Sequence, residues 1–178
     1  MSSGAVPSIP RRHILERVST DQVDQYLPYE QPDPRALAGD AVYLVDQWNR
    51  PLRAEGWMQN TPAPRTSAQK DLTGPGSPHW GLRAGHLLPA AQGGSGQWFN
   101  LVPITFEVNN SQAASIEAFI RGHLRNSVQI FLQVYVRYSG QSRIPDELTY
   151  YVYGINSSGG THLVEKRQIG GDKPVFWS

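Results

Sequence analysis

The fold of this chain is decided by residues 79–125, which read HWGLRAGHLLPAAQGGSGQWFNLVPITFEVNNSQAASIEAFIRGHLR. A glycine precedes His86 and Pro89 follows three residues later, so we expect His86 in a short extended segment that cannot continue as a helix. Residues 93–96, Gly-Gly-Ser-Gly, predict a turn before a second extended run at 98–103, which has aromatic and β-branched character. The pattern is therefore strand, loop, strand.

An amphipathic helix is predicted after this pair of strands, with Ser111 placed to cap its N-terminus. Apolar side chains then recur at the three- and four-residue spacing of a buried helix face: Ile116, Phe119, Ile120 and Leu124. Glu117 and Arg121, four residues apart, fall together on a neighbouring face of this helix. Taken by itself, this pair is an ordinary helix salt bridge.

Four motifs follow one another along this stretch: Arg-Ala-Gly-His at 83–86, Asn-Leu-Val-Pro at 100–103, an asparagine at 109, and Glu-Ala-Phe-Ile-Arg at 117–121. In these motifs the chain resembles the DNA/RNA non-specific endonucleases, whose active site is a ββα-metal (His-Me finger) unit. The resemblance implies an α+β fold in which this nuclease core carries an additional antiparallel β-sheet. Most members have an acidic residue and often an arginine before the Gly-His pair, where this chain has Arg83 and Ala84.

The resemblance also implies a role for each motif residue. His86 would be the general base, because an imidazole with a pKa of about 6.5 can accept a proton at neutral pH. Asn109 would bind a divalent cation, Mg²⁺ or another such as Mn²⁺, through its amide oxygen. Glu117 would complete the metal site by accepting hydrogen bonds from the cation's waters, and Arg121 would stabilise charge on the phosphate. Asn100 would support the His86 strand from within the site.

Simpler roles exist for several of these residues. Asn109 or Asn110 could cap the helix, and Asn100 could serve a turn. The remaining histidines have no comparable sequence context, and we expect them on the surface or in packing: His13, His79, His123 and His162.

Three cations are expected to contact nucleic acid. Arg83 lies beside the site, and Arg65 and Lys70 lie in residues 60–78, a proline-rich polar segment that we predict to be a long loop. For the two loop cations the alternative is simple solvation, which is the usual state of exposed charges in a polar loop.

Composition limits the class of protein. The 178 residues are 39% hydrophobic, enough for one core, and the chain has no cysteine, which excludes disulfide bonds and cysteine-based sites. No stretch approaches the length of a membrane span and the start lacks a signal-peptide layout, so we expect a soluble chain with no membrane segment. The net charge is only +1, but residues 61–178 carry 10 basic and 7 acidic side chains, against 6 and 8 in residues 1–60.

We divide the chain into an N-terminal extension or linker at 1–39 and a nuclease domain at 40–178. The extension is rich in proline and polar residues, with one candidate helix at 20–27. It could wrap the domain, form a flexible tail, or be the remnant of a junction with a longer polypeptide.

Within the domain, the pattern predicts a β-hairpin at 40–58. After the helix we expect an antiparallel meander stacked behind the catalytic unit. Its first strand, at 128–138, alternates as a strand buried on one face would. The other two strands are predicted at 148–155 and 161–169, joined by a tight connection at 156–160.

The expected function is metal-dependent, non-specific endonuclease cleavage of DNA, with RNA as a further substrate. The resemblance also implies a toxin domain that is secreted or delivered into the cytoplasm of a target cell and is blocked there by a cognate immunity protein. Two alternatives belong to other classes: a catalytically inactive nucleic-acid- or protein-binding module on the same fold, and a structural or interaction domain that is not a nuclease. Sequence motifs of other common hydrolases are absent from the chain.

Overall fold

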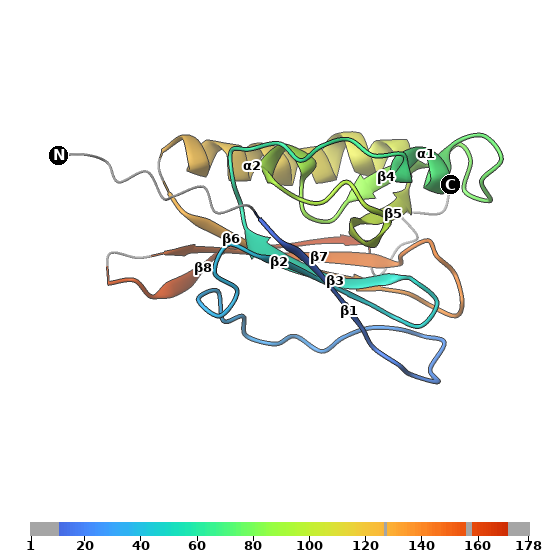
Figure 1. The fold of residues 1–178 in the computed structure, drawn as a ribbon, viewed down its shortest axis with the longest axis horizontal. Helices are drawn as coiled ribbons and strands as arrows, with labels where there is room; N and C mark the ends of the chain where they lie inside the picture. The colour runs from blue at the N-terminus through green and yellow to red at the C-terminus, as the bar shows by residue number, and fades with distance from the viewer. Residues whose placement is uncertain (1–10, 127, 156–157, 171–178) are drawn as a thin grey trace.

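A computed structural model of the protein describes residues 11–126, 128–155 and 158–170. Its main sheet has six strands in the spatial order β1-β2-β3-β6-β7-β8 (Figure 1). Only the β1–β2 pair is parallel, and the other four pairs described are antiparallel. The strands are β1 His13–Arg17, β2 Ala41–Val45, β3 Pro51–Trp57, β6 Ile130–Arg137, β7 Glu147–Ile155 and β8 Thr161–Gly170.

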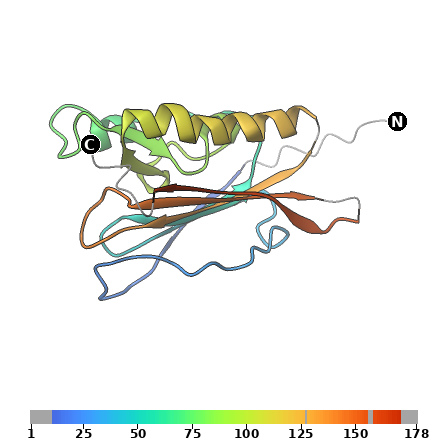
Figure 2. The same cartoon turned by 180° about the vertical axis from the view of Figure 1, so that it is seen from behind.

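A second layer lies on one face of this sheet (Figures 1 and 2). It contains the two-stranded β4–β5 sheet and the helix α2, so strand, strand and helix follow one another as predicted. The fold is therefore α+β, with a ββα unit stacked on a largely antiparallel sheet. The elements of this layer are α1 Ala68–Thr73, β4 Arg83–His86, η1 Ala90–Gln92, η2 Trp98–Asn100, β5 Leu101–Ile104, the π-helix η3 Val108–Ala113 and α2 Ala114–Arg125.

The hydrophobic core lies between the two layers. Ile116 and Ile120 of α2 are fully buried, and Phe119 and Leu124 are partly buried against the same core, so the predicted apolar face of the helix is confirmed. The sheet contributes alternate residues of β6 and β7, among them Leu132 and other members of the core cluster. Because each β-strand presents every second side chain to one face, this alternation places the helix side of the sheet in the core.

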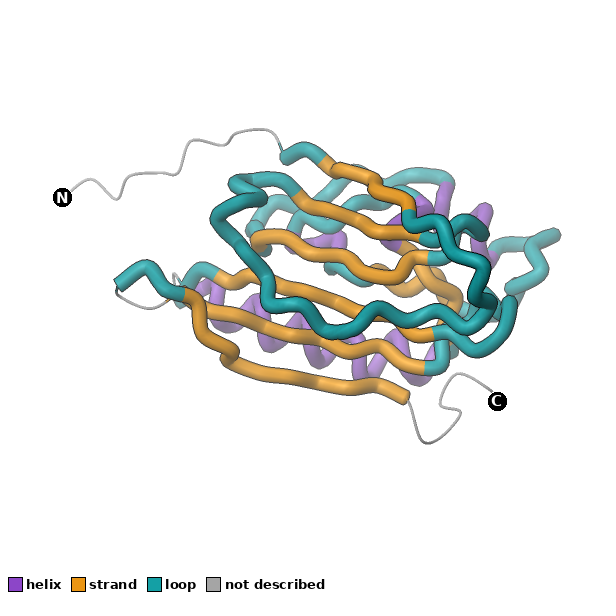
Figure 3. The backbone as a smooth tube through the Cα atoms, turned by 90° about the horizontal axis from the view of Figure 1, so that it is seen from below, coloured by secondary structure: helices purple, strands orange, loops and turns teal. Residues whose placement is uncertain are grey.

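The opposite face of the sheet is also covered, by part of the N-terminal extension, for which wrapping the domain was one of the alternatives left open by the sequence. Residues 18–39 cross this face (Figure 3), and β6 is buried on both sides along most of its length. Phe131 packs edge-on against Trp57 with ring centroids 5.4 Å apart, and Gln133 donates to the backbone oxygen of Glu30 at 3.2 Å. The prediction of one buried face was therefore wrong, because a distant segment covers the other.

The helix predicted at 20–27 is also absent from the structure of that segment. Gln25 instead forms a backbone bridge with Tyr138, with hydrogen bonds of 3.1 Å and 2.9 Å. These bonds to the main sheet replace the bonds that a helix would make within itself. The strand β1, which pairs in parallel with β2, was not predicted.

Two local predictions need smaller corrections. The segment 60–78 is not all loop, because it contains α1. Ser111 does not cap a helix, because helical structure has already begun and its hydroxyl donates to the backbone oxygen of Glu107 within the π-helix. The hairpin at 40–58 and the strands at 148–155 and 161–169 are confirmed by β2–β3, β7 and β8. Residues 156–157 of the connection lie outside the described residues.

Arg50 joins three separate segments at one end of the sheet. Its side chain is 1% exposed and forms an ion pair of 2.8 Å with Asp46, which is also fully buried. The guanidinium donates further to the backbone oxygens of Gly140, Ser142 and Val23 at 2.7 to 2.9 Å. The guanidinium thus donates hydrogen bonds to backbone carbonyl groups of the β6–β7 loop and of the N-terminal segment at the same time.

Replacing Arg50 by Met should lower the free energy of unfolding by about 3–5 kcal/mol, because the Asp46 carboxylate would stay buried without a cation. Urea denaturation measures this loss. The matched control is Arg12→Met, since the Arg12–Asp40 ion pair is at the surface and its arginine side chain is 76% exposed. We expect no measurable change for that variant, and equal stability of both variants would contradict the proposed importance of Arg50.

Candidate active site

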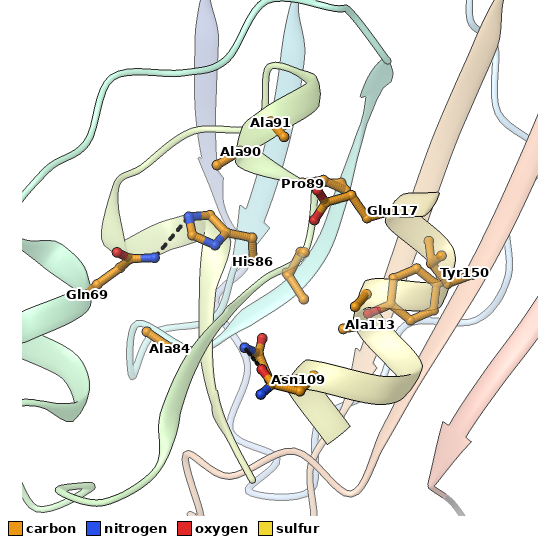
Figure 4. Close-up of a pocket in the computed structure, with 14 residues that line it drawn as sticks. Gln69, Ala84, His86, Pro89, Ala90, Ala91, Asn109, Ala113, Glu117 and Tyr150 are labelled. Carbon is orange, nitrogen blue, oxygen red and sulfur yellow. Dashed lines mark hydrogen bonds between the residues drawn. The ribbon is translucent and has the colours of Figure 1, made fainter. Parts of the chain in front are cut away.

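A cleft of about 290 Å³ opens between β4, the loop that follows it, and the helical segment η3–α2 (Figure 4). Three side chains capable of chemistry point into this cleft from three different elements: His86, Asn109 and Glu117. The full lining is Gln69, Ala84, His86, Leu87, Pro89, Ala90, Ala91, Asn109, Asn110, Ala113, Ala114, Ile116, Glu117 and Tyr150.

The pairing of β4 with β5 aims His86 at the cleft. The register places His86 opposite Leu101, and the second strand begins only there because residues 98–100 form the short helix η2. Ala84 and His86, two residues apart, line the cleft, so Gly85 faces the other way. A Cβ on Gly85 would lie 2.4 Å from the end of the Ile104 side chain, so a larger residue here would displace that side chain.

The surroundings of His86 favour its neutral form. Burial lowers the pKa of the imidazole below its ordinary value of 6.5, because the charged form loses solvation. The amide nitrogen of Gln69, on α1, lies 3.5 Å from Nε2 of His86 (Figure 4). A lowered pKa increases the fraction of neutral imidazole at pH 7, which is the form that can accept a proton.

Asn100 supports this arrangement from behind the cleft. Its amide is fully buried, accepts a hydrogen bond from the backbone N–H of Leu88 at 2.9 Å, and donates to the backbone oxygens of Leu88 and Ser95 at 2.8 Å each. These bonds close the loop between β4 and β5. A Cβ on Gly94 would lie 1.9 Å from the oxygen of Leu88, so the loop also requires glycine there. Asn100 therefore does not reach the cleft itself.

The two adjacent asparagines both line the cleft from η3. The Asn109 side-chain nitrogen lies 3.5 Å from the Asn110 side-chain oxygen, and the Asn109 backbone N–H bonds to Thr105 at 3.0 Å. Neither amide caps the described helix α2, whose N-cap is Ala113 without a side-chain bond. The helix-capping alternative is therefore wrong, and both amides remain available to the cleft.

Glu117 and Arg121 form the salt bridge expected of their spacing, with 2.7 Å between the guanidinium and the carboxylate. Glu117 lines the cleft, whereas Arg121 adjoins it only through this ion pair and is 44% exposed. Gln92 donates to the backbone oxygen of Glu117 at 2.9 Å and so ties α2 to the loop after β4. The observed ion pair is compatible with a surface role and with a site role.

The three cations expected against nucleic acid lie outside the cleft, and all three are exposed. Lys70 follows Gln69 on α1, and Arg65 precedes that helix. The Arg83 guanidinium lies over the ring of Phe106, 5.1 Å from its centroid.

The four other histidines, all described in the structure, are absent from the cleft lining, in line with their predicted surface or packing roles. His13 is 2.9 Å from the hydroxyl of Tyr43, and His123 is 3.0 Å from the backbone oxygen of Phe119.

Three residues near the site were missed by sequence reasoning: Gln69, Gln92 and Tyr150. Gln69 comes from a segment predicted to be loop, and Tyr150 comes from β7 of the main sheet, where it is 2% exposed. Nothing in the sequence near either residue indicates a site, since their proximity to His86 and Glu117 arises only on folding.

The oxygen donors of the cleft fit a cation that keeps most of its waters. Among the described residues no three His, Cys, Asp or Glu side chains group to enclose a metal. The cleft offers the amide oxygens of Asn109 and Asn110 and the carboxylate of Glu117. Mg²⁺ prefers such hard oxygen ligands and takes few of them from protein.

One cleft is thus lined by an imidazole, two amides and a carboxylate, and a strand–strand–helix unit carries these side chains. The sequence model of the DNA/RNA non-specific endonucleases matches residues 34–153, and the chain belongs to this family.

No helix within the described ranges is long and apolar enough to cross a membrane.

Comparison with solved structures gives weaker similarities. The chain resembles the crystal structure of NucA from Streptococcus agalactiae with magnesium ion bound, at 13% identity and a TM-score of 0.46, over 69% of this chain and 78% of NucA. It also resembles an extracellular nuclease at 21% identity and a TM-score of 0.47, over 66% and 67% of the two chains. A search of curated proteins gave no match.

Replacing Asn100 by Ala should lower the free energy of unfolding by about 1–3 kcal/mol, because the buried backbone groups of Leu88 and Ser95 would lose their partners. Thermal unfolding measures the loss. Gln97→Ala, at an exposed position in the same loop, is the control and should leave stability unchanged. A stable Asn100→Ala protein would contradict the structural role.

Proposed function

We propose that this protein is a metal-dependent endonuclease that hydrolyses phosphodiester bonds of DNA, and also of RNA, without sequence preference. The observation that carries the proposal is the convergence of His86, Asn109 and Glu117 on one cleft. Membership of the DNA/RNA non-specific endonuclease family supports it.

His86 is the general base. A water in the cleft attacks the phosphorus atom, and the unprotonated imidazole accepts the proton that this water loses. Burial favours the unprotonated ring at neutral pH, and Gln69 restrains the ring on its Nε2 side. The Arg121 guanidinium, held beside the cleft by Glu117, stabilises the charge that grows on the phosphate.

Asn109 and Glu117 would hold a divalent cation, Mg²⁺ or Mn²⁺. When bound, such a cation neutralises phosphate charge and assists the departing 3′ oxygen. Asn109 supplies a neutral amide oxygen and Glu117 accepts hydrogen bonds from the waters around the ion. Asn100 acts only through the loop that it closes.

Plasmid nicking with and without EDTA tests the function directly. The enzyme should cut in Mg²⁺ or Mn²⁺, lose activity in EDTA, and give products with no common end sequence, because phosphate and sugar contacts carry no base information. Full activity in EDTA would contradict the metal assignment. Binding without cleavage under all conditions would favour an inactive binding module on this fold.

His86→Ala should reduce turnover by about a hundredfold or more, the usual contribution of a general base. The melting temperature should change little, because the ring faces the cleft and not the core. Equal loss of activity and stability would show that the histidine is structural.

The pH profile of turnover provides a second test of the general base. Since burial lowers the pKa of His86, its base form persists as the pH falls to about 6.5 and is lost only at lower pH. The acid limb of turnover should therefore lie below pH 6.5. An acid limb above that value would contradict the assignment of His86.

A charge swap separates the site role of Glu117 and Arg121 from a surface salt bridge. As a surface pair, either residue could be replaced by Ala at a cost of at most about 1 kcal/mol, with turnover unchanged. If the pair acts in the site, each replacement should lower turnover tenfold or more. Each factor of ten corresponds to about 1.4 kcal/mol of activation free energy. The double variant Glu117→Arg with Arg121→Glu would keep an ion pair, and retained cleavage by it would end the site role.

The proposal also covers the bounds of the nuclease domain and the biological role of the protein. We assign residues 40–178 to the nuclease domain and 1–39 to an extension, of which residues 13–17 form β1 and residues 18–39 cross the sheet. We also propose that the protein is a toxin delivered into a target cell, where nucleic acid would be the substrate and a cognate immunity protein would block the site, as the family resemblance of the motifs implies. Expression in a bacterial cytoplasm should stop growth, and His86→Ala should restore it.

A further inference from the structure

Phe106 is a large apolar side chain left in solvent beside the cleft. It is 50% exposed and follows the end of β5 by two residues. The Arg83 guanidinium lies over its ring at 5.1 Å, so a flat aromatic group and a flat cation form one surface. Burial of this ring in the core is prevented by its position after the strand, not by any lack of apolar character.

Neither Phe106 nor Arg83 lines the cleft, but each lies close in sequence to residues that do. Residues 106 and 107 are helical and run directly into η3, so the cleft residues Asn109 and Asn110 lie three and four residues beyond Phe106. Arg83 directly precedes the cleft residue Ala84 on β4 and pairs with Ile104, and strand alternation directs its side chain to the face opposite Ala84 and His86. Each member of the pair is therefore tied to a residue of the cleft through one short, regular segment.

We infer that Phe106 and Arg83 form a stacking platform for an unpaired base of single-stranded nucleic acid whose backbone enters the cleft. A base has a flat face that can stack on an aromatic ring or a guanidinium, and this contact does not depend on sequence. Bases inside a duplex already stack on their neighbours and cannot offer that face without unpairing. The platform thus favours single strands, which deepens the proposed function and rests on it for the cleavage step.

Binding in EDTA tests the platform apart from catalysis. The probes are a fluorescent oligothymidine and a duplex of equal length, measured by anisotropy. Phe106→Ala should weaken single-strand binding roughly 5- to 150-fold, the range of one lost base stack, and leave duplex binding within twofold. Phe106→Leu, which keeps the apolar contact but loses the flat face, should resemble Phe106→Ala, and Phe106→Trp should bind at least as well as the original protein.

Arg83 distinguishes stacking from simple charge attraction. Arg83→Lys keeps the charge and loses the plane, so it should weaken single-strand binding nearly as much as Arg83→Ala. The dependence of binding on salt concentration separates the contribution of stacking from the contribution of charge attraction. Phe106→Ala should leave the slope of log K against log salt unchanged, whereas Arg83→Ala should lower its magnitude by up to about 0.7, the value for one phosphate on a single strand.

Tyr26→Ala is the matched control, because Tyr26 is an aromatic residue 64% exposed on the segment that covers the far face of the sheet. It should change neither affinity. Equal losses for single strand and duplex with Phe106→Ala, full binding by Arg83→Lys, or unchanged single-strand binding by Phe106→Leu would overturn the platform. If the original protein binds and cuts nucleic acid while Phe106→Ala behaves identically, only this inference fails. If the original protein binds neither probe and also fails to cut nucleic acid in Mg²⁺ or Mn²⁺, the proposed function fails with it.

Discussion

The buried amide of Asn100 is the constraint on which the site depends. It bonds to both backbone groups of Leu88 and to the oxygen of Ser95, and so fixes the loop that joins the two strands of the ββα unit. In the dry interior these groups have no water as an alternative partner, so the loop has little freedom to rearrange. The direction of His86, at the end of β4, follows from that closure.

A second buried polar set, around Arg50, holds the far end of the main sheet in the same way. Asp46 neutralises the guanidinium, and three carbonyl oxygens from distant segments complete its hydrogen bonds. Both sets use polar side chains to fix irregular backbone, which apolar packing cannot do, because loops carry unpaired N–H and C=O groups. The regular layers are held by the core, and Asn100 and Arg50 are two of the polar side chains that hold the loops.

The electrostatics of the molecule are local. With a net charge of +1, the chain has little bulk attraction for a polyanion, so in the proposed function phosphate would be recognised by groups placed next to the cleft. Arg121 is held there by Glu117, and Arg83 is held by the ring of Phe106. The neutral amides of Asn109 and Asn110 add oxygen ligands without adding charge, which leaves the carboxylate of Glu117 as the acidic group of the cleft lining.

Sequence alone determined the strand, loop, strand and helix of the ββα unit, and the order of His86, Asn109 and Glu117 along it. These signals are local: a glycine and a proline bracket a strand, and apolar residues three and four apart mark a helix face. The hairpin and the meander were predictable for the same reason. The prediction of a helix at 20–27 was wrong. Gln25 in this segment bonds to the backbone of Tyr138, more than a hundred residues away, and these bonds outweighed a weak local preference for helix.

Only the tertiary structure decided which polar residues are buried and which distant side chains meet. Arg50 reads as a turn residue, Asn100 as a motif residue and Gln69 as part of a loop, yet folding encloses the first two and brings the third to His86. The second covered face of β6 has the same origin. Burial and proximity of this kind depend on contacts between segments far apart in the chain, and such contacts leave no periodic trace in the residues on either side.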